Sequence, residues 1–308
     1  MRWRQYEHVF FDCDSTLTSV EGIDILADTA GKRWRVEVLT QAAMEGELDL
    51  EEIYDKRLRD FKPTHQQIRD IRRAYKQHVA ENARETISAL QELWHKVYII
   101  SGGLLEPVRE FGIFLGVPKD HIRAVGVTYN ELSGKWWISS DEQYMTFNDG
   151  ALTVSDGKAD IIKEFLAGQR GRSLLVGDGY SDLIAGNSVD LFVGFGGFEE
   201  RSRVREQAPV YVKSASLAPI LTLAAGPAAL ITLRKSEYQT LREKTLALLE
   251  EGVISFTDKQ LQARFERAVT AAQQSVESGV HQSSPADPEQ PDALDDWSST
   301  APGTMNDL

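Results

Sequence analysis

The sequence predicts an α/β protein built on a doubly wound, parallel, Rossmann-like sheet. Four short apolar runs end in glycine or aspartate, and helix-like segments separate them. Apolar runs of this length are typical of parallel strands that are buried on both faces. Strands that alternate with helices build a sheet of this kind, which binds its ligands at the carboxyl ends of the strands. We also expect a small helical cap inserted after the first strand and a helical C-terminal extension.

The elements follow the order of the apolar runs. The expected strands are His8–Asp12, Val97–Gly103, Leu174–Gly179 and Leu191–Gly197. The expected helices include Ala83–Trp94, Leu105–Phe114 and Asp160–Ala167. Residues Val125–Ser140 favour a β-hairpin, with Ser133-Gly134 at the turn between Val127–Tyr129 and Trp136–Ile138.

The segment between the first two strands is far longer than a crossover helix requires, and it is rich in charged and helix-forming residues. It therefore predicts the cap. The predicted units are an α/β core of residues 1–18 and 82–225, a cap of 19–81, an extension of 226–276 and a tail of 277–308. Two helices are expected in the extension, near Ser236–Glu251 and Asp258–Val276. The tail holds four prolines and seven acidic residues but no Lys or Arg, a composition typical of disorder.

Composition limits the classes of partner. The net charge of −13 over 308 residues argues against nucleic acid, because phosphate backbones attract basic surfaces. The single cysteine, Cys13, excludes an intrachain disulfide and a cysteine-based zinc site. The apolar stretch 217–233 is short for a membrane span of ~20 residues and is interrupted by prolines and a glycine. No signal-peptide core precedes the first charged motif. We expect a cytoplasmic protein that binds neither nucleic acid nor membrane.

Aspartates follow two of the expected strands. Asp12 and Asp14 come directly after the first strand, and two clustered carboxylates repel unless a cation or a proton lies between them. Taken alone, this motif is also compatible with an ordinary Asp-rich turn. Asp178 and Asp182 follow the third strand and could complete the oxygen-rich site that Mg²⁺ prefers. Dinucleotide binding is disfavoured, because Asp182 stands where that motif needs its third glycine.

Two further segments complete the pattern. Ser101-Gly102-Gly103 ends the second strand and could present a hydroxyl and backbone N–H groups to a phosphate, although it is also an ordinary turn. Lys158 precedes a helix, where a lysine is usually a solvated surface residue. Here it is the one cation in these motifs that could offset several aspartates and a phosphate.

These four segments, in this order, resemble the haloacid dehalogenase superfamily of phosphotransferases, from about His8 to about Leu221. The resemblance implies that Asp12 attacks phosphorus and forms an aspartyl-phosphate, and that Asp14 protonates the leaving oxygen and later activates water. Ser101 and Lys158 would hold the phosphoryl oxygens. The implied ligands of Mg²⁺ are Asp12, the backbone carbonyl of Asp14, Asp178 and, in support, Asp182.

Residues 14–16, followed by Glu21-Gly22-Ile23-Asp24, are similar to the phosphoserine phosphatase branch of this superfamily. The substrate contacts implied by that branch are Glu21, Met44, Arg57, Ser101, Gly102 and Gly103. Glu21 would meet the substrate ammonium, and Arg57 its carboxylate, for which a guanidinium fork is suited. Without the resemblance, the favoured interpretation of Glu21 and Arg57 is that of exposed helix charges, and the favoured interpretation of Met44 is packing within the cap.

The predicted function is Mg²⁺-dependent hydrolysis of a small phosphomonoester, with phosphoserine favoured. One alternative is hydrolysis of a different small phosphomonoester, or phosphoryl transfer to an acceptor such as homoserine. The alternative from another class is a non-catalytic scaffold, which the complete set of motifs disfavours. The extension could pack on the sheet, bind another protein or mediate a homodimer. Cys13 lies between acidic residues, which raise a thiol pKa, so we interpret it as a packing residue.

Overall fold

The computed structural model describes residues 3–29, 31, 63–129, 144–147, 151–154, 156–233 and 236–280 of the chain. The strands are β1 (His8–Phe11), β2 (Lys96–Leu104), β3 (Ile122–Val125), β4 (Val127–Tyr129), β5 (Tyr144–Phe147), β6 (Ser173–Gly177), β7 (Leu191–Phe195), β8 (Val210–Val212) and β9 (Ile254–Phe256). The helices between β1 and β6 are α1 (Gly22–Thr29), α4 (His65–Gln77), α5 (Ala83–Glu92), α6 (Leu105–Phe114) and α7 (Gly157–Leu166). Those that follow β6 are α8 (Tyr180–Ala185), α9 (Ser202–Gln207), α10 (Ala218–Ala225), α11 (Ala229–Thr232), α12 (Gln239–Glu250) and α13 (Lys259–Val280).

A seven-stranded sheet in the order β3-β2-β1-β6-β7-β8-β9 forms the centre of the molecule. Neighbouring strands run parallel except at the edge, where β9 pairs antiparallel with β8. Every residue of β1, β6 and β7 is buried, as the continuous apolar runs predicted. The predicted doubly wound α/β fold is therefore confirmed.

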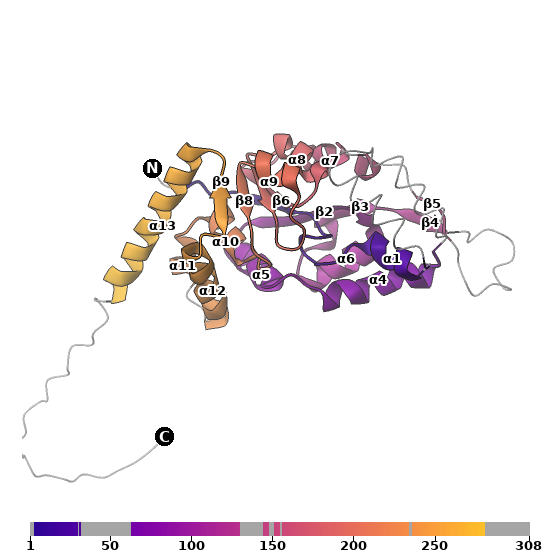
Figure 1. Ribbon diagram of the computed structural model, residues 1–308, viewed down its shortest axis with the longest axis horizontal. Coiled ribbons are helices and arrows are strands. Elements are labelled where there is room, and N and C mark those ends of the chain that lie inside the picture. Colours follow the sequence, from indigo (N-terminus) through magenta and orange to yellow (C-terminus); the bar gives the residue numbers. More distant parts are fainter. Residues whose placement is uncertain are drawn as a thin grey trace, which may run out of the picture.

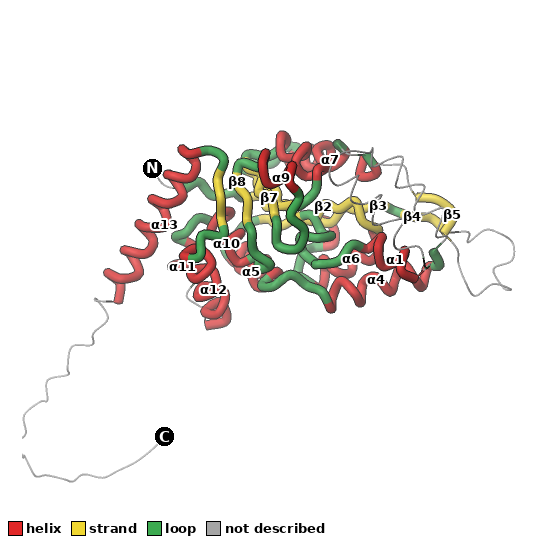
Figure 2. Tube along the Cα trace, in the orientation of Figure 1, coloured by secondary structure: helices red, strands yellow, loops and turns green. Residues whose placement is uncertain are grey.

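Helices cover both faces of this sheet. Helices α7 and α8 lie on one face, and α5 and α6 lie on the other, so that the strands form the middle of three layers (Figures 1 and 2). Helix α10 packs between α5 and α12. The core is one continuous cluster of buried apolar side chains that runs through all of these elements. This layering leaves the carboxyl ends of the strands free to carry polar groups.

The insertion between β1 and β2 is helical in its described part, α1 and α4. Helix α4 begins with a capping box, in which Thr64 and Gln67 satisfy each other's backbone N–H groups. It packs against α1 and against α6, one of the helices that cover the sheet. Met44 and Arg57, predicted to contact substrate from this insertion, lie outside the described residues.

Strand β4 pairs antiparallel with β5, Tyr144–Phe147. The hairpin predicted from the sequence pairs Val127–Tyr129 with Trp136–Ile138, and residues 136–138 lie outside the described residues. That pairing stays a prediction.

The C-terminal extension is joined to the sheet rather than suspended from it. Strand β9 covers the edge of β8, and α13 packs against β9 and α11. The chain's N-terminal segment reaches the same place (Figure 1). There the Trp3 and Phe265 rings meet edge to face, with their centroids 5.0 Å apart. Both helices predicted here are present, as α12 and α13, and α13 continues to Val280, past the expected end at Val276. No helix in the described ranges is long and apolar enough to cross a membrane.

Candidate active site

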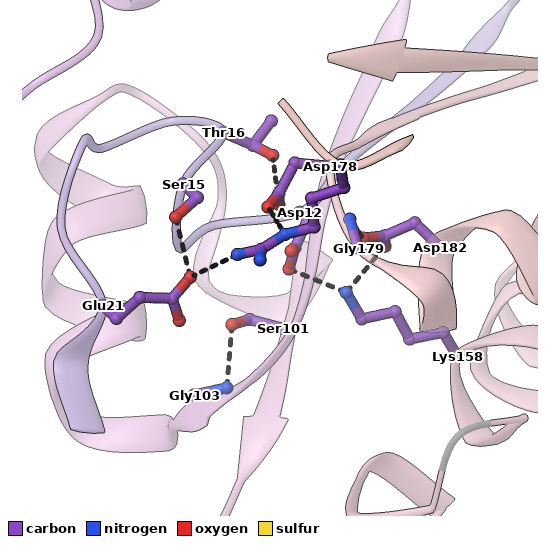
Figure 3. A network of polar contacts seen from close by, with 11 residues as sticks. Asp12, Ser15, Thr16, Glu21, Ser101, Gly103, Lys158, Asp178, Gly179 and Asp182 are labelled. Atoms are coloured by element: carbon purple, nitrogen blue, oxygen red, sulfur yellow. Dashed lines mark hydrogen bonds and ion pairs between the residues drawn. The ribbon is translucent and has the colours of Figure 1, made fainter. Parts of the chain in front are cut away.

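Polar side chains meet where β1 and β6 end, side by side at the centre of the sheet. Asp12 follows β1 and Asp178 follows β6, and the Asp12 N–H donates to the Val176 carbonyl at 2.9 Å, which aligns the two strand ends. Strand order reverses at β1, because the chain passes first to β2 on one side and later to β6 on the other. Ligands of open α/β sheets bind at such a switch point. Figure 3 shows the side chains that converge there.

Lys158, in the first turn of α7, links two of the aspartates. Its Nζ lies 2.8 Å from Asp12 Oδ1 and donates to Asp182 Oδ1 at 2.7 Å (Figure 3). Burial acts to lower the pKa of Lys158, but the two carboxylates outweigh it and raise the pKa above its usual value. Lys158 is therefore a fixed positive charge beside Asp12, not the solvated surface lysine of the alternative interpretation.

Three carboxylates form the centre of the site. Asp12, Asp178 and Asp182 are all buried, and one oxygen from each lies within 4.8 Å of the others. Burial, as the largest cause, raises the pKa of Asp178 to about 7 and that of Asp182 to about 8. Neighbouring carboxylates add to both shifts. Clustered buried carboxylates with raised pKa values are groups that a divalent cation would stabilise in their charged form.

Each of the two later aspartates is held by donors on both sides. Asp178 accepts the Thr16 hydroxyl at 3.2 Å on Oδ1 and the Arg201 Nε–H at 3.1 Å on Oδ2. Asp182 accepts the Gly179 N–H at 3.1 Å on Oδ2, which also caps helix α8. These contacts fix the planes of the two carboxylates.

Asp14 lies beside this cluster but is not one of its three carboxylates. Its Oδ1 accepts the Gly22 N–H at 3.3 Å, at the start of α1. Burial, the largest cause, raises the pKa of Asp14 to about 7 and Asp12 raises it further, while the neighbouring Tyr75 hydroxyl and the Gly22 N–H oppose the shift. A carboxyl with such a pKa can give up and take back a proton near neutral pH.

The Ser101-Gly102-Gly103 segment lies inside β2, where its register against β3 shifts between Ile100 and Leu104. Such irregularities re-aim side chains and are common next to active sites. The Gly103 N–H donates to Ser101 Oγ at 2.9 Å. A Cβ on Gly103 would lie only 2.8 Å from Asp14 Oδ2, so glycine is required for the strand to pass this close to the carboxylate. The prediction had the strand end here, whereas it continues to Leu104.

Glu21 lies at the edge of the site, before α1, and its side chain is only 12% exposed. It accepts the Ser15 hydroxyl at 2.7 Å, and Ser15 itself adopts a left-handed backbone with φ of 51°. Burial raises the pKa of Glu21 to about 8, and the negative charge of Asp14 raises it further. The interpretation of Glu21 as an exposed helix charge is therefore wrong for this residue.

Arg201 is a residue of the site that the sequence reasoning missed. Its Nη2 lies 3.7 Å from Glu21 Oε1, and its Nε–H donates to Asp178, so it bridges two elements of the site. It is only 4% exposed. The available signal was its place in the loop after β7, because the loops that follow parallel strands meet at one edge of the sheet.

Cys13 is fully buried and makes no disulfide. Burial, followed by Asp14 and Asp12, raises its thiol pKa well above the usual value. A protonated, enclosed thiol is not a nucleophile, so the structure agrees with the interpretation of Cys13 as a packing residue.

The fold and the site define a doubly wound α/β protein with a cluster of buried aspartates at the carboxyl ends of its strands. A family model described as haloacid dehalogenase-like hydrolase matches residues 9–186. The chain belongs to this family, which confirms the predicted superfamily.

The curated relatives belong to the predicted branch. The chain is 33% identical to a phosphoserine phosphatase of Drosophila melanogaster over 68% of its own length and 75% of that protein's. It is 32% identical to the phosphoserine phosphatase of Homo sapiens, over 66% of its own length and 88% of the human protein. These relatives and the family confirm the predicted class of enzyme, a phosphoric monoester hydrolase.

The fold itself also has solved counterparts. A phosphoserine phosphatase solved as an analogue of its phospho-aspartyl intermediate is 24% identical and superimposes with a TM-score of 0.60, over 71% of this chain and 99% of that one. Since nearly all of that structure is matched, the rest of this chain has no counterpart in it. A substrate-bound phosphoserine phosphatase, 23% identical, gives the same TM-score over 71% of this chain and 98% of its own. At this level of identity, these two structures show a shared fold.

Proposed function

We propose that the protein hydrolyses O-phosphoserine to serine and phosphate, with Asp12 as the nucleophile. The observation that carries the proposal is the arrangement at Asp12. Its carboxylate is buried at the end of β1, 2.8 Å from the Lys158 ammonium and clustered with Asp178 and Asp182. A carboxylate of this kind, beside a fixed cation that can also meet phosphoryl oxygens, is suited to attack a phosphomonoester.

In this proposal the reaction has two halves. Asp12 attacks phosphorus, the bond to the serine oxygen breaks, and Asp14 gives that oxygen a proton. A water molecule then attacks the aspartyl-phosphate, Asp14 takes the proton from the water, and Asp12 is released. Lys158 and Ser101 would hold the phosphoryl oxygens throughout. The pKa of Asp14, raised to about 7, supports both of its proton transfers.

The donor set suits a divalent cation, and Mg²⁺ is our specific proposal. Asp12 and Asp178 would hold it together with the Asp14 backbone carbonyl, because carboxylate and carbonyl oxygens are the ligands that Mg²⁺ prefers. Asp182 would act in support, since Lys158 and the Gly179 N–H already occupy its two oxygens. When bound, the cation would neutralise charge on the phosphoryl group.

Substrate recognition rests on the relatives and on Glu21. The curated relatives are phosphoserine phosphatases, and Glu21, Met44 and Arg57 are the substrate contacts that the resemblance to this branch implies. Glu21 is 12% exposed and lies at the edge of the buried site, so it could meet the substrate ammonium. Ser101, Gly102 and Gly103 would contact the phosphate. Met44 and Arg57 remain proposed contacts, with Arg57 on the substrate carboxylate.

A phosphate-release panel tests this function. It compares L-phosphoserine, D-phosphoserine, phosphothreonine, phosphoethanolamine and a sugar phosphate, each with and without Mg²⁺. We expect the highest kcat/KM for L-phosphoserine and no turnover without a divalent cation. Turnover of every compound at a similar rate would contradict the choice of substrate, and no turnover of any compound would contradict the enzyme. A homodimer and a cytoplasmic location stay predictions.

A further inference from the structure

Tyr75, on helix α4, connects the insertion between β1 and β2 to the candidate active site. The side chain is completely buried, and its ring packs against Phe111 of α6 at 5.4 Å between centroids. Its hydroxyl reaches the start of α1, where a Cβ on Gly22 would overlap the Tyr75 oxygen. Glycine at position 22 therefore leaves the space that this hydroxyl fills.

The same space adjoins Asp14. The Gly22 N–H donates to Asp14 Oδ1, and Gly103 lies against Asp14 Oδ2, so glycine backbone borders both oxygens. The charged group that acts most strongly on the Tyr75 hydroxyl is Asp14, which together with burial raises the pKa of Tyr75 well above its usual value. Asp14 is thus enclosed by backbone and by one tyrosine.

The Tyr75 hydroxyl makes no well-aligned hydrogen bond within the described part of the chain. Buried hydroxyls are nearly always hydrogen-bonded, and each exception calls for an explanation. Packing explains the ring, which phenylalanine would also supply, but it does not explain the oxygen. A small movement of α4 or of the Asp14 side chain would align the Tyr75 hydroxyl with the Asp14 carboxylate. The carboxylate would then accept a hydrogen bond from the hydroxyl.

We propose that Tyr75 is a positioning residue that donates a hydrogen bond to the Asp14 carboxyl during turnover and holds it against the leaving oxygen of the substrate. The proposal rests on the proposed function, in which Asp14 moves a proton. Tyr75 keeps its own proton throughout: Asp14 gives one to the leaving oxygen and recovers one from water, while the tyrosine fixes the plane of the carboxyl group. Since Tyr75 belongs to α4, Asp14 is aligned only when this helix is packed against α1 and α6.

Tyr75→Phe tests the role, because it removes the oxygen and keeps the ring. An alkyl leaving group such as serine needs the proton from Asp14, whereas p-nitrophenolate leaves without it. We expect kcat on L-phosphoserine to fall by about 10- to 100-fold, a part of the gain that a general acid supplies, with KM within about two-fold. We expect kcat on p-nitrophenyl phosphate to change by less than about three-fold, and Tm to stay the same or rise.

The matched control is Tyr98→Phe. Tyr98 is also a buried tyrosine, but its hydroxyl is paired with His8 Nδ1 at 3.2 Å, at the other end of the strands. This variant should keep both activities and lose stability. Equal losses on both substrates for Tyr75→Phe, or none on either, would overturn the positioning role. Wild-type enzyme that hydrolyses p-nitrophenyl phosphate but not phosphoserine contradicts the proposed substrate instead, and the comparison then uses the best alkyl phosphate of the panel. Wild type inactive on all compounds overturns both proposals.

A second variant tests the same contact from its other side. Gly22→Ala places a methyl group where the Tyr75 hydroxyl lies and should lower kcat on L-phosphoserine by about 10-fold or more. In the double variant the oxygen is absent, so Gly22→Ala should add little to the loss caused by Tyr75→Phe. Losses that simply multiply would show that the two positions act independently and would contradict the proposal.

Discussion

The carboxyl ends of β1 and β6 and the far edge of the sheet at β9 are built on opposite principles. At the strand ends, Asp12, Lys158 and Asp182 are no more than 5% exposed, and they are held by charge pairs and backbone donors. At the far edge, the buried side chains are mostly apolar, such as Leu241 and Phe265, which are no more than 4% exposed. At the strand ends, charged side chains are buried although water would solvate them better. At the far edge, burial removes apolar side chains from water, which is favourable.

The buried charges at the strand ends serve catalysis, whereas the buried apolar side chains at the far edge serve stability. Carboxyl groups whose pKa values are raised by burial oppose folding at neutral pH, because the unfolded chain releases their protons more readily. Each apolar side chain buried at the far edge instead stabilises the fold by about 1.5–3 kcal/mol. The solved phosphoserine phosphatase is matched over 99% of its length by 71% of this chain, so this protein carries more chain than that fold requires.

Asp12→Asn should abolish catalysis at the strand ends without reducing the stability of the fold. We expect kcat to fall by about 10⁴-fold or more, because no other group can replace the nucleophile. The free energy of unfolding should be unchanged or higher, since one of the repelling charges is removed. Phosphate release and urea unfolding measure the two effects. Asp160→Asn, which removes an exposed carboxylate paired with Lys163, should alter neither. Activity above about 1% of wild type would show that Asp12 is not the nucleophile.

Leu241→Ala should have the opposite effect and reduce the stability of the fold without reducing catalysis. Leu241 lies on α12, is 1% exposed, and its removal leaves a cavity between α12 and its neighbours. We expect the free energy of unfolding to fall by about 2–5 kcal/mol, with kcat within about two-fold of wild type. Urea unfolding and phosphate release at a temperature well below Tm are the measurements. A kcat loss as large as that of a site variant would mean that the extension acts on the active site.

The sheet and the aspartates could be predicted from the sequence because each rests on a local signal. Runs such as His8–Asp12 are apolar throughout, and buried parallel strands produce this pattern. Asp12, Asp178 and Asp182 follow such runs, and parallel strands place their ends together. The prediction of their proximity followed from topology alone and is confirmed by the geometry.

The remainder depended on contacts between distant segments, which carry no local signal. Arg201 reaches Asp178 across 23 residues of chain, and its place in the loop after β7 does not by itself distinguish it from an arginine exposed on the surface. Tyr75 reads as a core aromatic on a helix, since its role depends on the absence of a side chain at Gly22. Strand β9 is three residues long, and it is recognisable only once β8 offers an edge to pair with. The roles of Met44 and Arg57 stay predictions.

Adding Mg²⁺ should raise the free energy of unfolding, because the cation offsets the repulsion between the clustered carboxylates. Because the pKa values of Asp178 and Asp182 are raised, the stability of the free protein falls as pH rises from about 4 towards 8, where these groups lose their protons. A cation replaces those protons, so it should bind and stabilise more strongly at pH 8 than at pH 6. At 100 times its Kd the stabilisation is about 2.7 kcal/mol. Thermal unfolding measures it, and Asp178→Asn should abolish it. An equal rise in Tm at both pH values, or an undiminished one in Asp178→Asn, would contradict the proposed site.

His95, just before β2, provides the smallest and most local test. It is buried before β2, its Nδ1 lies 2.8 Å from the Tyr6 carbonyl, and burial lowers its pKa. As pH falls through about 6.5, the unfolded chain gains a proton that the folded chain does not, so the free energy of unfolding should decrease, by at most about 1.4 kcal/mol per pH unit. The site carboxyls change stability in the opposite direction, and comparison with His95→Gln removes their contribution. Urea unfolding at pH 5.5 and 7 should therefore show that acidification changes the free energy of unfolding more favourably in the variant than in wild type, with unchanged kcat. The same pH dependence in both proteins would mean that His95 takes up its proton in the folded state.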